Sequence, residues 1–173
     1  MSFDRVRAAI RDIPDFPKPG ILFKDITPIL SDPALFKTVV DAFAARHKNS
    51  GVTKIAAVES RGFLFGAAVA YQLGLGLVPV RKKGKLPYKT VEQTYDLEYG
   101  TATLEIHQDA FRAGDRVVLI DDLLATGGTA RAAAELIEKL GASVVEIDFL
   151  VELAFLKGRD KLTRFKLFAP VVF

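Results

Sequence analysis

The sequence contains no cysteine, and that absence excludes two kinds of structure. Without thiols the chain can form neither a disulfide framework nor a cysteine-ligated metal site. No apolar run approaches the roughly 18 residues that a membrane-spanning helix needs. Residues 1–16 also lack the unbroken apolar stretch of a secretion signal. We therefore expect a cytoplasmic protein, because a reducing compartment suits a chain without cysteine.

A large excess of charge of one sign is also missing. The chain has 24 basic and 21 acidic residues, with a formal net charge of +3. This balance is too mild to indicate a nucleic-acid partner. Half of the 173 residues are hydrophobic, which is enough for one domain with a full core. We expect a single domain over residues 1–173.

Apolar runs and helix signals alternate along most of the chain. Strands are expected at residues 54–58, 77–80, 101–106, 117–120 and 144–151, with a short strand near 166–169. Helices are expected at 62–74 and 129–140, and an earlier helix begins at Pro33 with Asp32 as its cap. This alternation favours an α/β fold with a central, mostly parallel, twisted sheet flanked by helices.

Two segments depart from the alternation. Residues 14–30 contain four prolines and a glycine, yet they carry many large apolar side chains. We expect a mostly irregular but ordered hood, about residues 1–32, packed on a core of about residues 33–173. Residues 83–99 are polar and rich in turn formers, which is typical of a flexible lid loop.

The segment VVLIDDLLATGGTA places two acids and a loop of small residues after a buried strand. In open parallel sheets, ligands bind beyond the carboxyl ends of the strands. Small side chains at Ala125–Thr129 allow a phosphate to approach backbone amides and a helix N-terminus, and Thr126 adds a hydroxyl donor, as does Thr129. Carboxylates repel phosphate, whereas the vicinal hydroxyls of a ribose offer two donors to Asp121 and Asp122. The pattern therefore predicts a phosphoribosyl site.

A plain helix cap with a glycine-rich turn would also explain Gly127-Gly128-Thr129 alone, but it would not explain the paired acids. The lysine of the triphosphate-binding loop and the glycine spacing of the dinucleotide-binding loop are both absent. His47 and His107 have no partner at a spacing that indicates a metal or catalytic site.

Two further segments carry groups that bind anions. Residues 59–62, Glu-Ser-Arg-Gly, end a strand and begin a helix, which makes a second anion cradle possible; a salt-bridged surface arginine is the alternative. Four cations then fall within five residues, at Arg81, Lys82, Lys83 and Lys85. A solvated surface is the alternative for this run.

The glycine-containing segment resembles the sugar-diphosphate signature of the type I phosphoribosyltransferase family. PDFPKPGILFKDITP, ESRGFLFG, RKKGKLPYKT and LEYG resemble the members of that family that use adenine, and the similarity covers nearly the whole chain. The resemblance implies transfer of phosphoribosyl from 5-phospho-α-D-ribose 1-diphosphate (PRPP) to adenine, giving AMP and pyrophosphate in purine salvage. It also implies Mg²⁺ as the cofactor and a homodimer, with no nucleic acid or membrane as partner.

The resemblance assigns roles to particular residues. Arg61, Glu98, Asp121 and Asp122 are implied to be catalytic, and no residue is assigned directly to the metal. Residues implied to bind substrate are Leu22, Phe23, Ser60, Arg61, Arg81, Lys82, Lys85, Asp121, Asp122, Ala125, Thr126, Gly127, Gly128 and Thr129. Leu22 and Phe23 resemble a wall of the adenine pocket. The basic segment at residues 81–85 resembles an arm that reaches the pyrophosphate site of a partner subunit.

Three alternatives stay open at this point. The first is an enzyme of the same fold that uses another base, such as hypoxanthine, xanthine or orotate. The second is a regulator that senses PRPP and binds nucleic acid, which the mild charge argues against. The third is a plain structural domain, which would leave two anion cradles unexplained.

Overall fold

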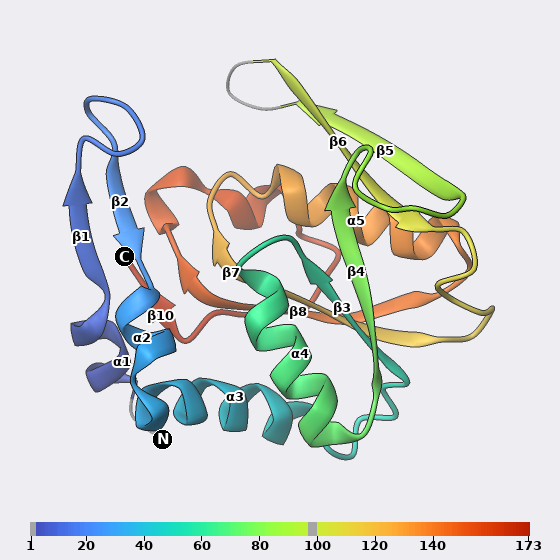
Figure 1. The fold of residues 1–173 in the computed structure, drawn as a ribbon, viewed down its shortest axis with the longest axis horizontal. Coiled ribbons are helices and arrows are strands. Elements are labelled where there is room, and N and C mark those ends of the chain that lie inside the picture. The colour runs from blue at the N-terminus through green and yellow to red at the C-terminus, as the bar shows by residue number, and fades with distance from the viewer. Residues whose placement is uncertain (1–2, 97–99) are drawn as a thin grey trace. The chain divides into compact units, whose positions relative to one another are not determined.

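The computed structural model describes residues 3–96 and 100–173, and Figure 1 shows the course of the chain. The chain divides into two compact units, Met1–Ala42 and Phe43–Phe173. Helix α3 (Pro33–His47) begins in the first unit and ends in the second. A single domain with a hood and a core stays a prediction.

The first unit contains short helices and one pair of strands. Its elements are α1 (Asp4–Ala9), β1 (Arg11–Pro14), β2 (Leu22–Asp25), α2 (Thr27–Ser31) and the start of α3. The two strands pair antiparallel, so backbone groups of this proline-rich stretch bind each other. The sequence predicts a mostly irregular segment over residues 14–30, and the structure is more regular there. Local composition could not reveal the pairing, because the partner strand β1 lies mostly before the segment.

Helix α3 starts where the sequence predicts. Oδ1 of Asp32 accepts hydrogen bonds from the backbone N–H of Ala34 at 2.8 Å and of Leu35 at 3.1 Å. Pro33 occupies the first helical position, where a missing N–H costs nothing.

The second unit is built on one sheet with helices. Its strands are β3 (Lys54–Val58), β4 (Gly76–Lys82), β5 (Thr90–Asp96), β6 (Thr101–His107), β7 (Arg116–Leu124), β8 (Ser143–Glu152), β9 (Leu167–Phe168) and β10 (Val171–Val172). Its other elements are α4 (Gly62–Leu73), α5 (Gly128–Lys139) and the 3-10 turns η1 (Ala154–Leu156) and η2 (Gly158–Lys161). The strand order is β10-β8-β7-β3-β4-β6-β5, with β9 pairing to β8. The strands from β10 to β4 are parallel, whereas β6 and β5 run antiparallel to their neighbours. The predicted α/β class is confirmed.

The connections that leave the centre of the sheet run in opposite directions. β3 leads through α4 to β4 on one side, and β7 leads through α5 to β8 on the other. Because such crossovers are right-handed, the two helices cover opposite faces, and Figure 1 shows α4 in front of the sheet. The strand order therefore reverses between β3 and β7, which pair directly. The crevice beyond the carboxyl ends of these two strands is where ligands of such sheets bind.

Strand β7 extends past its predicted end at Ile120. Its pairing with β8 continues as far as Leu124, which lies opposite Glu152. The acids Asp121 and Asp122 therefore lie within the strand rather than after it. Sequence reasoning ended the strand too early because the two carboxylates interrupt the apolar run.

Helix α4 packs tightly on the sheet through a glycine. A Cβ atom on Gly66 would lie 2.5 Å from Cβ of Ala57 in β3. The helix is apolar on nearly all sides, as its sequence predicts. Even so, within the described residues no helix has both the length and the apolar character to cross a membrane.

We predict that Gly66→Ala lowers the free energy of unfolding by about 1–3 kcal/mol, because overpacking outweighs the gain in helix propensity. Urea denaturation measures the effect. Gly76→Ala is the matched control, because Gly76 has no positive φ and no atom within 4 Å of its added Cβ. Equal effects of the two substitutions would contradict the tight α4–β3 contact.

Candidate functional site

The glycine loop, Ala125–Thr129, lies at the carboxyl end of β7, next to the point where the strand order reverses. Gly127 has a φ of +79° and precedes the first residue of α5, Gly128. A cavity of about 70 Å³ is lined by the loop together with Asp121, Leu123, Leu124, Ala130 and Phe149. The structure thus brings the loop and one of the two acids to a single small cavity.

The loop meets the requirement for binding an anion through its backbone. The first amides of a helix have no acceptor within the helix, and the helix dipole places partial positive charge there. The first helical bond into the loop runs from the N–H of Arg131 to the carbonyl of Gly127, at 3.0 Å. An anion at the cavity would therefore meet the amides at the start of α5.

Neighbouring groups exclude a side chain on Gly127 and leave little room for one on Gly128. A Cβ on Gly127 would lie 2.4 Å from the carbonyl oxygen of Gly158, and one on Gly128 would lie 3.2 Å from the ring of Tyr95. The Tyr95 hydroxyl also lies 3.1 Å from Oγ1 of Thr129. Sequence reasoning identified the glycines by their access to a ligand and missed both neighbours, which lie far from the loop in the chain.

The two acids have different surroundings. Oδ1 of Asp121 accepts a hydrogen bond from the N–H of Asp122 at 2.9 Å, and Asp121 lines the cavity. Oδ2 of Asp122 lies 2.8 Å from Nε of Arg61, as an ion pair rather than a directed hydrogen bond. Only Asp121 shares the cavity with the glycine loop. Asp122 instead links β7 to the second predicted cradle through Arg61.

Both carboxyl groups have pKa values above their usual range. Burial raises the pKa of Asp121 well above its usual range, and the neighbouring charge of Asp122 adds to the rise. Burial also raises the pKa of Asp122, although the Arg61 guanidinium opposes this change. A site with two ionised acids here stores repulsion that a cation or a hydrogen-bond donor would relieve.

The second cradle, residues 59–62, joins β3 to α4 through a cis peptide bond between Glu59 and Ser60. A Cβ on Gly62 would lie 2.9 Å from both Oδ1 of Asp121 and the carbonyl oxygen of Ile120. Only glycine fits there, so the N-terminus of α4 approaches β7 directly. The two predicted cradles therefore meet where the strand order reverses, and the sequence alone did not indicate that meeting.

The carboxylate of Glu59, the residue that follows β3, holds the start of the basic segment Arg81–Lys85. The guanidinium of Arg81 binds Oε2 of Glu59 at 2.9 and 3.0 Å, and the N–H of Lys82 donates to Oε1 of Glu59 at 2.6 Å. Nη1 of Arg81 donates to the carbonyl of Lys85 at 2.9 Å. Lys83 pairs with Glu92 at 2.8 Å. In the part of the chain that the structure describes, the ammonium groups of Lys82 and Lys85 have no ion-pair partner.

A second carboxylate, Glu105 of β6, fixes the turn that follows Lys83. Glu105 is buried and accepts hydrogen bonds from the N–H groups of Lys85 and Leu86, both at 2.8 Å. Burial alone would raise the pKa of Glu105, but the amide donors outweigh it and the pKa is lowered. Sequence reasoning missed Glu59 and Glu105 as supports, because each acts on backbone amides about 20 residues away.

Two of the predicted site residues belong to the first unit, and a third is not among the described residues. Leu22 and Phe23 belong to β2 in the first unit, where Leu22 is exposed and the Phe23 ring meets Phe16 edge-on at 5.0 Å. Their role at a base pocket stays a prediction. Glu98 lies outside the described residues.

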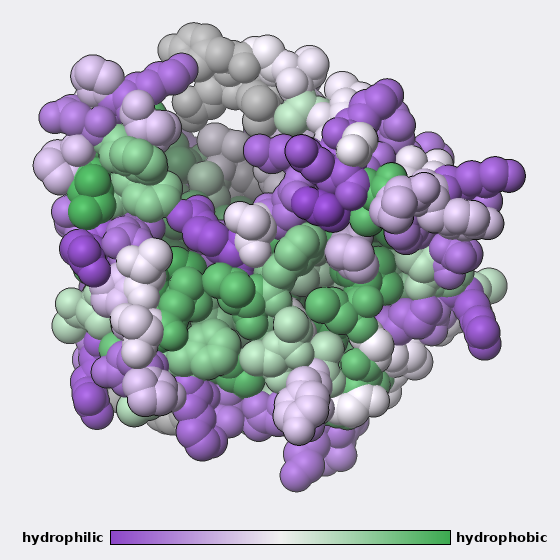
Figure 2. All heavy atoms as spheres, viewed as in Figure 1, coloured by the Kyte–Doolittle hydropathy of each residue, from purple (hydrophilic) through white to green (hydrophobic). Residues whose placement is uncertain are grey.

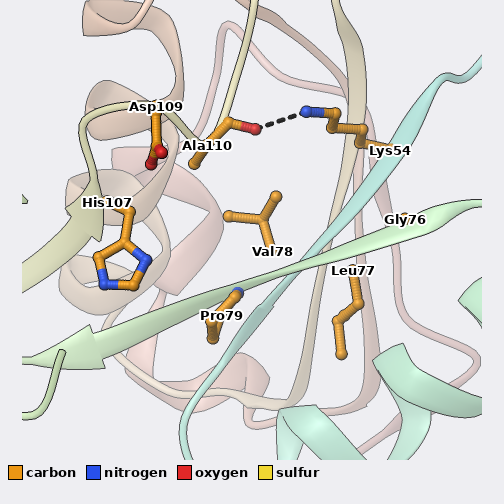
Figure 3. A pocket seen from close by; sticks show the side chains of 8 residues that line it. All are labelled: Lys54, Gly76, Leu77, Val78, Pro79, His107, Asp109 and Ala110. Carbon is orange, nitrogen blue, oxygen red and sulfur yellow. Dashed lines mark hydrogen bonds between the residues drawn. The ribbon is translucent and has the colours of Figure 1, made fainter. Parts of the chain in front are cut away.

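A larger hollow lies at the other ends of the strands (Figure 3). It measures about 240 Å³ and lies beside the first residues of β3 and β4, Lys54 and Gly76. Nζ of Lys54 donates a hydrogen bond to the carbonyl of Ala110 at 2.6 Å, so the ammonium group already has a partner within the protein. The hollow is separate from the two cradles, which lie at the carboxyl ends.

One group of potential metal ligands occurs in the described parts of the chain, namely His47, Glu146 and Asp148. His47 binds Asp148 at 2.7 Å, and Arg46 pairs with Glu146. Burial raises the pKa of Asp148, and its bond to His47 opposes the rise. Each acid already has a basic partner, and the sequence prediction that His47 is neither a catalytic residue nor a ligand stays a prediction.

Asp121→Asn is expected to raise the free energy of unfolding at about pH 8 and to change it little near pH 4. The raised pKa means that the folded state binds this proton more tightly than the unfolded chain, whose pKa is about 3.9. That contribution is complete below the unfolded pKa and is lost as the pH rises through the folded pKa. Asparagine carries no charge, so it avoids the loss; urea denaturation at both pH values measures it.

Asp115→Asn is the control with the opposite sign. The amide of Arg112 and the hydroxyl of Thr53 lower the pKa of Asp115. Its stabilising effect is present above the unfolded pKa and is lost as the pH falls through the folded pKa. We expect the control to lose stability near pH 8. A loss in Asp121→Asn of the same sign and pH dependence would show that the strain at Asp121 is absent.

Comparison with known proteins places this geometry in a family. Residues 25–164 match the family described as phosphoribosyl transferase domain. The chain is 59% identical over 157 residues to the adenine phosphoribosyltransferase of Acidothermus cellulolyticus, covering 91% of this chain and 89% of that protein. It is 58% identical over 168 residues to that of Syntrophotalea carbinolica, covering 97% and 98%.

Solved structures agree with the sequence matches. The adenine phosphoribosyltransferase of Thermoanaerobacter pseudethanolicus has a TM-score of 0.96 at 52% identity, covering 99% of this chain and 100% of that one. The Saccharomyces cerevisiae enzyme, crystallised with adenine and an imino-altritol bisphosphate, has a TM-score of 0.92 at 44% identity, covering 96% and 97%. Identity at this level extends over nearly the whole of both chains, and the chain belongs to the phosphoribosyltransferase family, among the adenine phosphoribosyltransferases.

Proposed function

We propose that this chain transfers the phosphoribosyl group of PRPP to N9 of adenine, forming AMP and pyrophosphate in purine salvage. The observation that carries the proposal is the meeting of the glycine loop, Asp121 and the 59–62 cradle where the strand order reverses. A substrate with a phosphate at one end and a diphosphate at the other needs two cradles joined by groups that bind its hydroxyls. The yeast relative was crystallised with adenine and a bisphosphate, which supports such a substrate.

In this proposal the glycine loop anchors the 5′-phosphate. Its amides and the N-terminus of α5 supply donors and partial positive charge, and Thr126 supplies a hydroxyl, as does Thr129. Asp121 accepts hydrogen bonds from the ribose hydroxyls, because it shares the cavity with the loop. Asp122 holds Arg61 at 2.8 Å and places its negative charge nearby. The anchored sugar then presents C1 to the base in a fixed orientation.

The reaction forms a bond from adenine N9 to C1 of the ribose and breaks the bond from C1 to the pyrophosphate oxygen. Pyrophosphate leaves as a polyanion, and the N9 proton of adenine passes to it, directly or through water. Arg61 and the amides of the 59–62 cradle, with Ser60, stabilise the leaving group. Asp121 lies near the positive charge that develops on the ribose ring. Glu98 is proposed to act near the reacting centre, as the resemblance implies.

Mg²⁺ is proposed as the cofactor, and the acids present fit it. Mg²⁺ binds oxygen ligands, often one or two carboxylates together with substrate phosphates. Burial and the charge of Asp122 raise the pKa of Asp121, so a cation beside Asp121 would relieve repulsion there. When bound, the ion would offset negative charge on the departing pyrophosphate.

The adenine pocket is proposed to include Leu22 and Phe23. The Phe23 ring offers a face on which a purine can stack, and Leu22 offers an apolar side chain and backbone groups for the base edge. The exposed side chain of Leu22 leaves it available for such a contact.

A homodimer is proposed as the working form, in the cytoplasm. The outer face of α4 supports this, because Leu64, Ala67 and Tyr71 are exposed on it and Tyr71 is 90% exposed. Figure 2 shows apolar side chains gathered over the area where α4 lies in Figure 1. Exposed apolar patches of this kind mark contact surfaces between chains. Arg81 is occupied by Glu59, so Lys82 and Lys85 are the cations of the arm that are open to a partner's pyrophosphate.

A panel of bases tests the function. With PRPP and Mg²⁺, we expect AMP to form from adenine. Hypoxanthine, xanthine and orotate should form nucleotide far more slowly than adenine does. Chromatographic detection of the nucleotide and of pyrophosphate measures both products. Faster turnover of another base would support an enzyme of the same fold with a different substrate. Binding of PRPP and nucleic acid without any nucleotide formation would support a regulator.

The double variant Asp121→Asn, Asp122→Asn tests the role of the two acids in the same assay. It removes both charges but keeps the shapes of the side chains, so it should fold and lose far more turnover than stability. Unchanged steady-state rates in a folded double variant would remove the proposed role of the acids.

Mixing two inactive variants tests the arm. If Lys85 acts across the dimer, Lys85→Ala mixed with Thr126→Glu under subunit exchange should recover about a quarter of the parent activity, because half of the dimers are mixed and each has one intact site. Each variant alone is the baseline, and Lys83→Ala mixed with Thr126→Glu is the matched control, since Lys83 is paired with Glu92. Absence of recovery would assign Lys85 to its own subunit's site.

A further inference from the structure

The 3-10 turn η2 lies directly against the backbone of the glycine loop. A Cβ on Gly158, the first residue of η2, would lie 2.2 Å from the carbonyl oxygen of Ala125. A Cβ on Gly127 would in turn lie 2.4 Å from the carbonyl oxygen of Gly158. The two segments therefore touch backbone to backbone, with no side chain between them.

This contact matters because the loop has few means to hold its own shape. Its residues, Ala125–Thr129, carry small side chains and Gly127 has a positive φ. Backbone amides bind an anion well only when they are held in the correct directions before it arrives. The support must come from neighbouring segments, and Gly158 is the neighbour that the backbone of Ala125 and Gly127 meets.

A forked ion pair holds η2 in this place. Nε of Arg159 lies 2.8 and 2.9 Å from the two carboxylate oxygens of Glu152, and Nη2 lies 2.6 Å from Oε2. Glu152 is buried and is the last residue of β8. It lies opposite Leu124, the residue before the loop, in the register of β7 and β8. The fork thus ties η2 to the same sheet position from which the loop departs.

We propose that Gly158 and Arg159 are positioning residues for binding of the 5′-phosphate. The Arg159–Glu152 fork holds Gly158 against Ala125 and Gly127, which sets the direction of the loop amides. Arg159 acts through Gly158 rather than on the substrate, because Glu152 already occupies two nitrogens of its guanidinium. The inference rests on the proposed function of the loop as the phosphate site.

The experiment compares Arg159→Ala, Arg159→Lys and Gly158→Ala with Arg164→Ala. Arg164 pairs with Glu138, which lies at the opposite end of α5 from the glycine loop, so it controls for loss of a partly exposed ion pair. Each protein is measured for its KM values for PRPP and adenine, its kcat, its Kd for ribose 5-phosphate by calorimetry, and its Tm.

Arg159→Ala should raise the KM for PRPP and the Kd for ribose 5-phosphate about 10-fold, with less than about a 2-fold change in the KM for adenine. Arg159→Lys keeps the charge without the planar fork and should fall between the parent and Arg159→Ala. Gly158→Ala should resemble or exceed Arg159→Ala where it folds. The control should match the parent in all binding constants.

Two results would overturn the inference. One is a Kd for ribose 5-phosphate in Arg159→Ala equal to that of the control. The other is a fall in Tm with equal losses for both substrates, which would indicate a purely structural role. Failure of the proposed function would give a different result, namely a parent protein that binds ribose 5-phosphate but forms no AMP. The Kd values of the variants for ribose 5-phosphate would still test the inference in that case. A parent that binds no ribose 5-phosphate would overturn both proposals.

Discussion

Two parallel strands, β3 and β7, pair directly, and the chain leaves them in opposite directions along the sheet. Right-handed crossovers then place α4 and α5 on opposite faces, with both N-termini directed to the same crevice. Two helix N-termini provide amides and partial positive charge for two anionic groups on one ligand. The features of the site described above follow from this arrangement.

The close approach at that crevice explains why its glycines are required. Gly62 lets α4 reach the end of β7, and Gly127 lets the glycine loop lie on Gly158. In each case the obstacle to a side chain is backbone or a fixed carboxylate, which cannot move aside. The glycines therefore serve the packing of the protein as well as access for a ligand.

Charge at the site works against the stability of the fold. Burial disfavours ionisation of Asp121 and Asp122, and their proximity adds repulsion that Arg61 offsets only in part. Groups that bind ribose hydroxyls and a cation must nevertheless be ionised acceptors. The surrounding apolar core, with β7 buried from Val117 to Ile120, supplies the stability that the site lacks.

The sequence by itself determined the α/β class, most of the elements and the two motifs that carry the site. Apolar runs such as residues 54–58, the cap at Asp32 and the small residues after Asp122 are local patterns, and local chemistry is sufficient to interpret them. The family resemblance rested on the same contiguous segments.

Tertiary structure alone decided which distant groups support those motifs. Glu105 holds amides about 20 residues away, Tyr95 reaches Thr129, and Gly158 supports Gly127, although nothing near any of these residues indicates a partner. The separation of Asp121 and Asp122 into different environments was also hidden, because it depends on where β7 stops pairing with β8. Hydrogen bonds and close contacts act over a few ångströms in space, so only the folded chain shows which residues they join.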